Sequence, residues 1–182
     1  PVRAVVEYTL TDTIVYIFVI TANKFELITQ AIDSSFFRNI QMMRNATSSG
    51  DLMSVRMEDY LAYSGAAWSL YKVLIEPCNK VMTEKKLIII PDSEIGYISF
   101  DMLLDAAPDK KVMDFRNLSF LIRNYVISYS ASAMLQFSGL KSTGKKAKRN
   151  LLAMAPSYDN LTNLKENGFT DETGKKVYLL PI

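Results

Sequence analysis

The sequence predicts an α/β fold, and the changing spacing of apolar residues along the chain carries this prediction. Segments rich in β-branched and aromatic residues come first, separated by tight turns. Two stretches with apolar residues at helical spacing follow, and short aliphatic runs then alternate with helical segments. Strands that alternate with helices are typical of a parallel sheet with helices packed on it, so we expect a doubly wound sheet.

The N-terminal segments predict an antiparallel meander, which we expect to form a small sheet ahead of the main fold. The expected strands are Val2–Thr9, Thr13–Thr21 and Phe25–Thr29. The turn-like pairs Thr11-Asp12 and Ala22-Asn23 separate them, since Asp and Asn favour tight turns.

Two helices are expected after the meander. Asp33-Ser34 suits a helix N-cap, and Thr47–Gly50 stops the first helix. Its apolar positions are Phe36, Phe37, Ile40 and Met43. A longer helix follows and ends at Pro77, because proline is not tolerated inside a helix. Its apolar stripe consists of Met57, Tyr60, Leu61, Trp68, Tyr71, Leu74 and Ile75.

Three aliphatic runs predict strands that are covered on both faces, as in parallel sheets. They are Lys86–Pro91, Tyr125–Tyr129 and Leu151–Ala155. Ser130 or Ser132 is expected to cap a helix that reaches about Gly139. The last apolar piece, Val177–Leu180, is not followed by a helix in the sequence. A sheet that ended there would leave one of its faces partly uncovered.

Composition excludes several classes of function. The 182 residues are 49% apolar and 22% charged, which suits one globular domain with a real core. A net charge of +2 is too small to indicate nucleic-acid binding. The longest apolar run, Ile14–Ile20, is far shorter than the roughly 20 residues that span a bilayer, so no membrane partner is expected. A lone cysteine, Cys78, suits a reducing, cytoplasmic setting.

The complete absence of histidine excludes most familiar catalytic centres from these residues. Without histidine there is no Ser-His-Asp or Cys-His catalysis, and no zinc site that uses histidine. Cys78 has no base to activate its thiol, since Lys80 is a poor substitute, and is expected to be a partly buried structural residue.

The remaining motifs are explained by loop structure. Gly139–Lys146 resembles a phosphate-binding loop, but Lys146 stands where Ser or Thr should hold magnesium, and the segment leaves a helix instead of a strand. The basic residues of this region are expected to form a solvated loop: Lys141, Lys145, Lys146, Lys148 and Arg149. We therefore assign no catalytic, cofactor-binding or metal-binding residue and no cofactor.

The acidic residues after the first aliphatic run form the last candidate site. Asp92 and Glu94, with Asp101 and Asp105 nearby, allow an acid-metal enzyme as one hypothesis. A turn is favoured over a metal site, with Asp92 bonding local backbone N–H groups.

Two stretches together resemble the CHAT domain, a caspase-like module often attached to tetratricopeptide repeats. Residues 87–103 (LIIIPDSEIGYISFDML) are similar to its strand, Pro-Asp-Gly turn and Leu-Pro-Phe segment. Residues 120–133 (FLIRNYVISYSASA) are similar to its second signature, which ends in Ser-Tyr and Ala-Pro-Ser-Ala. The resemblance covers nearly the whole chain. It departs from the family at Ser93, where glycine is usual, and at Ser99 and Ala131, where proline is usual.

The resemblance implies a cysteine peptidase-like domain whose His and Cys lie at the ends of two later strands, beyond Ile182. The chain, which begins at Pro1 and not Met, is then expected to be the truncated N-terminal part of one such domain. Within it, residues 1–50 would form the meander and first helix, 51–85 the long helix, and 86–182 the start of the parallel sheet. The parent would be a bacterial, cytoplasmic, repeat-containing hydrolase or a degenerate relative used for regulation, acting on a protein or peptide.

An alternative from another class stays open. The chain could be a stand-alone, non-enzymatic α/β interaction or sensor module. An incomplete sheet would expose apolar surface and so leaves self-association open.

Overall fold

The computed structural model describes residues 3–48, 56–138, 169–170 and 176–177. The chain divides into two compact units, residues 1–142 and 143–182, which are described separately. The described part of the second unit is a short antiparallel pair of strands, β6 (Phe169–Thr170) and β7 (Lys176–Val177). The expected strand 151–155 lies outside the described residues, and so does the last apolar piece, 177–180, apart from Val177 in β7.

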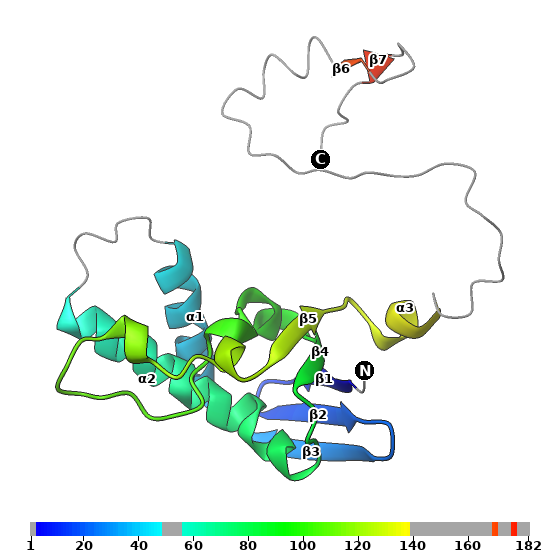
Figure 1. Cartoon of the computed structure of the whole chain (residues 1–182), viewed down its shortest axis with the longest axis horizontal. Coiled ribbons are helices and arrows are strands. Elements are labelled where there is room, and N and C mark those ends of the chain that lie inside the picture. The colour runs from blue at the N-terminus through cyan, green and yellow to red at the C-terminus, as the bar shows by residue number, and fades with distance from the viewer. Residues whose placement is uncertain (1–2, 49–55, 139–168, 171–175, 178–182) are drawn as a thin grey trace. The chain divides into compact units, whose positions relative to one another are not determined.

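A five-stranded mixed sheet forms the centre of the first unit (Figure 1). Its strands are β1 (Ala4–Leu10), β2 (Ile14–Ile20), β3 (Phe25–Ala31), β4 (Lys86–Ile90) and β5 (Val126–Tyr129). Their order across the sheet is β3-β2-β1-β4-β5. β1 to β3 are antiparallel neighbours, whereas β1, β4 and β5 run parallel.

The meander is confirmed, but its expected place in a separate small sheet is wrong. β1 pairs in parallel with β4, with Val5 opposite Ile88, so the meander is one half of the main sheet. The physical reason is that β1 has buried apolar side chains on both faces. Val6 and Tyr8 are buried on one face and Val5 on the other, so β1 needs cover on both faces, which a place in the middle of the main sheet provides.

The two expected helices are confirmed as α1 (Ser34–Ser48) and α2 (Met57–Leu74). Asp33 caps α1, because its carboxylate accepts hydrogen bonds from the Ser35 N–H at 2.8 Å and from the Ser35 hydroxyl. Pro77 lies just past α2, in the short 3₁₀ helix η2 (Glu76–Lys80). The helix therefore ends where the proline predicts.

α1 and α2 share one hydrophobic core with one face of the sheet. Phe36, Ile40 and Met43 of α1 are buried in it, as expected. The buried face of α2 differs from the expected stripe, since Met57 is exposed and Leu61 and Trp68 are half-buried. It consists of Tyr60, Tyr63, Ser64, Ala66, Ala67, Leu70, Tyr71 and Leu74. Three of these residues, Ser64, Ala66 and Ala67, are small, and a stripe of large apolar side chains does not include them.

The opposite face of the sheet has a smaller core of its own. Val5, Ile88 and Ile90 are buried there, with Ile20 and Ala133 packed against them. Ala133 opens the short helix α3 (Ala133–Ser138). The Ser132 hydroxyl accepts a hydrogen bond from the Leu135 N–H at 3.1 Å, which confirms Ser132 as the N-cap.

β5 is the strand that departs most from expectation. It was expected to be covered on both faces, yet Val126 is 64% and Tyr129 48% exposed. Among the described strands, only β4 pairs with it. With one described neighbouring strand, β5 has fewer adjoining side chains to cover it than a central strand has.

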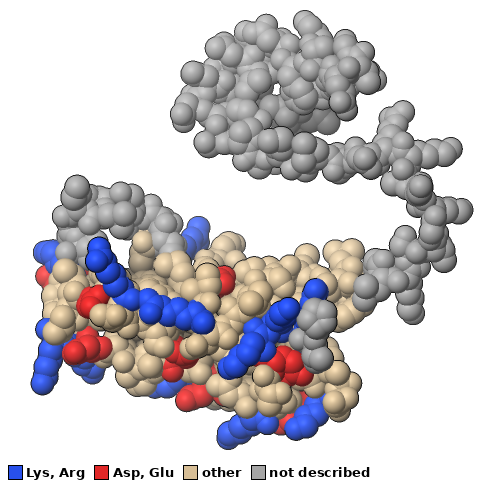
Figure 2. Space-filling view, in the orientation of Figure 1, with Lys and Arg blue, Asp and Glu red and all other residues tan. Residues whose placement is uncertain are grey.

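The surface of residues 3–48 and 56–138 carries mixed charge. On the face seen in Figure 2, basic and acidic side chains are interspersed instead of gathered by sign. Of the helices that the structure describes, none has the length and apolar character needed to cross a bilayer.

Candidate functional site

The carboxyl ends of the three parallel strands form the first candidate site. β1, β4 and β5 run in the same direction, so Leu10, Ile90 and Tyr129 end at one edge of the sheet. In α/β sheets this edge is where ligands bind and where functional side chains gather. The residues that follow β4 and β5 are therefore the candidates for functional residues.

Asp92 ties the ends of β1 and β4 together. Its carboxylate Oδ2 accepts a hydrogen bond from the Leu10 N–H at 2.9 Å. The predicted turn is present, since the Ile95 N–H donates to the Asp92 carbonyl and opens η3 (Ser93–Tyr97). The predicted local partner of the carboxylate is wrong. The Asp92 side chain instead satisfies the N–H of Leu10, which lies on the β4 side of β1 beyond Glu7, where the pairing of β1 with β4 ends.

Ser93 stands in this turn with a left-handed backbone conformation. Its φ is 49°, and it is the one non-glycine residue with positive φ among those described. Side chains other than glycine are strained at such angles. The position where the family signature usually has glycine thus keeps the glycine conformation, with a serine in it. Serine at this position raises the conformational energy of the turn and leaves its backbone shape unchanged.

Tyr129, at the carboxyl end of β5, connects this strand to the segment around Phe100. Its hydroxyl accepts a hydrogen bond from the Phe100 N–H at 2.9 Å and donates one to Asp101 Oδ2 at 3.0 Å. Burial, followed by the Asp101 charge, raises the pKa of Tyr129. The tyrosine therefore stays protonated and holds η4 (Phe100–Met102) against the end of the strand.

The four acidic residues do not come together. Glu94 is exposed, and Asp101 is bound to Tyr129. Asp105 accepts hydrogen bonds from the Ser119 hydroxyl and from Asn124 Nδ2 at 2.6 Å. Across the described ranges, no group of three or more Asp, Glu, Cys or His side chains is arranged to hold a metal ion. The geometry therefore does not support the acid-metal hypothesis.

Cys78 is fully buried, more deeply than predicted, in η2. Its Sγ lies 3.5 Å from the Leu74 carbonyl oxygen, to which the thiol donates. Burial raises the pKa of the Cys78 thiol to about 12. A thiol that stays protonated at neutral pH is a poor nucleophile, so Cys78 is a structural residue.

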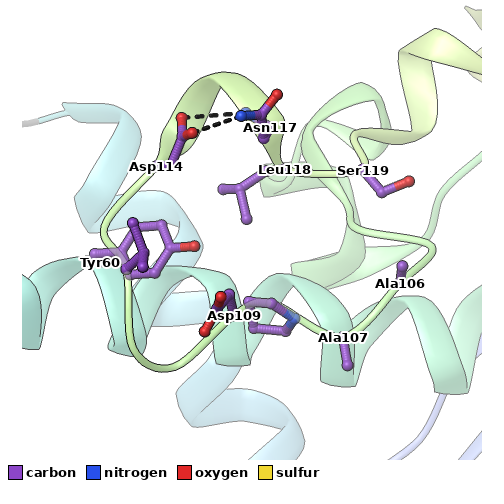
Figure 3. Close-up of a pocket in the computed structure, with 10 residues that line it drawn as sticks. Tyr60, Ala106, Ala107, Asp109, Asp114, Asn117, Leu118 and Ser119 are labelled. Atoms are coloured by element: carbon purple, nitrogen blue, oxygen red, sulfur yellow. Dashed lines mark hydrogen bonds between the residues drawn. The ribbon is translucent and has the colours of Figure 1, made fainter.

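A hollow of about 300 Å³ between α2 and the loop 106–119 is a second candidate (Figure 3). Its wall includes Tyr60 from α2 and the carboxylates of Asp109 and Asp114. Asp114 caps η5 (Phe115–Asn117), accepting hydrogen bonds from the Asn117 amide at 2.6 Å and from the Arg116 N–H at 2.9 Å. These bonds, led by the one from the Asn117 side chain, lower the pKa of Asp114.

Both carboxylates of this hollow serve the loop itself. Asp109 Oδ1 accepts a hydrogen bond from the Lys111 N–H at 2.7 Å. The Phe115 ring anchors the loop by packing edge-on against Tyr60, with centroids 5.0 Å apart. The residues lining the hollow bring no activated nucleophile together, so we assign it no chemistry. Sequence reasoning did not find it, because Tyr60 lies more than forty positions from the loop.

The phosphate-loop-like segment and the basic run, residues 139–149, lie outside the described residues. The structure therefore does not place them at either candidate site.

The comparison with known families agrees with the two signature stretches. A family model described as the CHAT domain matches residues 65–176, which include both stretches. No curated protein matches the sequence. The matched range starts within α2, so β1 to β3 and α1 precede it, although β1 lies beside β4 in the same sheet. The match spans more than half of the 182 residues, and the chain therefore belongs to the CHAT domain family.

Proposed function

We propose that this chain is the scaffold portion of a caspase-like cysteine peptidase domain and that the catalytic His and Cys are supplied by residues outside these 182. The observation that carries the proposal is the CHAT match on a sheet whose parallel strands β1, β4 and β5 end at one edge. In the proposed role, the segments after β4 and β5 form part of the wall of a cleft for a protein or peptide substrate.

The residues present fit a structural role in the domain and not a catalytic one. The sequence has no histidine to act as general base. Its single thiol is buried, with a pKa raised to about 12. At the edge itself, Asp92 and Asp101 are engaged in hydrogen bonds that join strand ends and short helices. These bonds connect the strand ends to their neighbours, which is the support that a catalytic dyad brought from elsewhere requires.

The decisive experiment begins with the reading frame that contains this chain. We expect it to encode a later apolar strand ending in His-Gly and another ending near a cysteine. The protein expressed from that frame should then be labelled by a thiol-directed covalent peptidase inhibitor. Labelling should survive Cys78→Ala and disappear when the later cysteine is replaced by alanine. A frame without that His and Cys would remove the peptidase proposal.

The remaining parts of the proposal concern the parent protein. We infer a bacterial, cytoplasmic polypeptide that also carries tetratricopeptide repeats, on the ground that CHAT domains are often attached to such repeats. Sequencing the same reading frame tests this directly.

A second candidate, a non-enzymatic interaction module, is favoured by the exposed apolar side chains near β5. Met134 is 80% and Leu135 66% exposed on α3, next to the half-exposed edge of the sheet. A thermal-shift experiment separates the two. A self-sufficient module should melt in one cooperative transition, whereas part of a larger sheet should melt gradually, without a sharp transition.

A further inference from the structure

β3 lies at one edge of the five-stranded sheet. Among the described strands, β3 pairs only with β2. The hydrogen bonds from the Thr21 N–H to the Lys24 carbonyl and from the Ile32 N–H to the Thr13 carbonyl show which residues of β3 face β2. The even-numbered residues of β3 direct their N–H and C=O groups toward β2. In an antiparallel ladder the backbone groups of the alternate residues, here the odd-numbered ones, point away from the partner strand. The N–H and C=O groups of Phe25, Leu27, Thr29 and Ala31 therefore point outward.

This edge has the properties of a pairing surface. Phe25 is 67% and Leu27 48% exposed, and Thr29 and Ala31 are exposed as well. Proteins usually protect an edge strand with proline, lysine, a bulge or a very short length. β3 has seven residues, its paired register with β2 is unbroken, and it contains neither proline nor lysine.

We propose that β3 pairs antiparallel with β3 of a second copy of this chain, about a two-fold axis at Ile28. In this register Phe25 lies opposite Ala31 of the second copy, and Leu27 lies opposite Thr29. These are the outward-facing residues, so each such pair exchanges two backbone hydrogen bonds. The two five-stranded sheets then join into one continuous sheet.

Side-chain size and charge select the second copy as the occupant. On one face the register places each large side chain, Phe25 or Leu27, opposite a small one. On the other face it places Glu26 opposite Gln30, so no like charges meet. Shifting the two-fold axis to Leu27 or to Thr29 places Glu26 opposite Ile28 or Ile32 and leaves outward residues at one end without partners. The register at Ile28 therefore pairs the whole strand.

The first test uses the charge of residue 30. Gln30→Lys places a lysine opposite Glu26 of the second copy, at two symmetry-related contacts, and should lower the dimer dissociation constant by about tenfold. Gln30→Glu places like charges there and should raise that constant by about tenfold. Sedimentation of the purified 182-residue chain at low salt measures both. In high salt the two effects should shrink together.

Matched controls use Thr9, an exposed residue of β1. Thr9→Lys and Thr9→Glu add the same charges away from β3 and should leave the dissociation constant unchanged. The proposal is overturned by a chain that stays monomeric at high concentration, or by Gln30→Lys and Gln30→Glu shifting the constant in the same direction. A dimer that dissociates on Met134→Lys and ignores both changes at residue 30 also overturns it, and would move the interface to α3.

The second test locks the proposed axis. Ile28 lies opposite its own copy at a non-hydrogen-bonded position, where the Cα atoms are about 4.5 Å apart, a distance that a disulfide spans. Ile28→Cys should therefore form a covalent dimer on mild oxidation, reversed by a reducing agent. Glu26→Cys, with Gln30 and not itself as its partner, should not. Cys78 is buried and does not compete. Equal cross-linking of both variants would contradict the register.

Discussion

β4 and β5 are neighbouring parallel strands with similar apolar content and very different surroundings. In β4, Leu87 and Ile89 are buried against the helices, and Ile88 and Ile90 are buried on the other face. In β5, Val126 is 64% exposed and Tyr129 is 48% exposed. The difference is one of position, because β4 lies between β1 and β5 whereas β5 has one described neighbour.

The comparison shows that a strand's burial depends on its place in the sheet as much as on its sequence. β4 contains four consecutive aliphatic residues, but β5 contains Ser128, whose hydroxyl donates to the Leu87 carbonyl at 3.1 Å. β5 is therefore held to β4 partly by polar contacts. Truncations in the two strands should therefore lower the free energy of unfolding by very different amounts.

The largest difference is expected from truncating each strand to alanine. Ile89→Ala removes a fully buried side chain from β4 and should lower the free energy of unfolding by about 2–5 kcal/mol. Val126→Ala in β5 should lower it by less than about 0.5 kcal/mol, since that side chain is mostly in solvent. Urea denaturation of both variants measures the two values. Similar losses would mean that β5 is covered after all.

A smaller effect is expected where β5 does have a specific contact. Tyr129→Phe removes the acceptor of the Phe100 N–H and the donor to Asp101, which should lower the free energy of unfolding by about 1–2 kcal/mol. Tyr125→Phe is the matched control. Its hydroxyl makes a longer, exposed bond of 3.3 Å to Asn79, so the loss should stay below about 0.5 kcal/mol. Equal losses would count against the role given to Tyr129.

A substitution in the turn after β4 is expected to raise the free energy of unfolding instead of lowering it. Ser93→Gly should raise the free energy of unfolding by about 0.5–1 kcal/mol, because glycine adopts a φ of 49° without strain. Ser99→Gly is the control six residues later. Ser99 has a φ of −85°, so glycine there only adds flexibility and should lower stability by about 0.5–1 kcal/mol. The same sign for both would refute the strain at Ser93.

The last expected effect is a loss of stability in alkaline solution, where tyrosine side chains lose their protons. Burial raises the pKa of Tyr63 to about 12 and, less strongly, that of Tyr129, from 10.0. The folded chain holds these protons more tightly than the unfolded chain. Their stabilisation is therefore complete below pH 10 and is lost as the pH rises from 10 through about 12. Unfolding measured across this range should show a shallower loss in Tyr63→Phe and, to a smaller degree, in Tyr129→Phe. A stability that rises above pH 10 would contradict the sign.

Local signals in the sequence predicted most of the elements. The aliphatic run at Lys86–Ile90, the Asp33 cap and the stop at Pro77 each act on their own neighbours, so they can be recognised without the fold. The two signature stretches predicted the family that the comparison then showed. Contacts between distant segments could not be predicted in this way. Asp92 bonds Leu10 across 82 positions, and Tyr129 bonds Asp101 across 28.

What the sequence determined by itself was the set of strands and helices, the family and the lack of a histidine. These depend on residue type and spacing, which act over a few positions along the chain. Only the tertiary structure decided that the meander joins the main sheet, that small residues of α2 are part of its buried face, and that β3 and β5 are the sheet's edges in the described unit. Those outcomes depend on which strands become neighbours in the sheet. The pairing of β1 with β4 depends on the burial of both faces of both strands, and neither strand determines it alone.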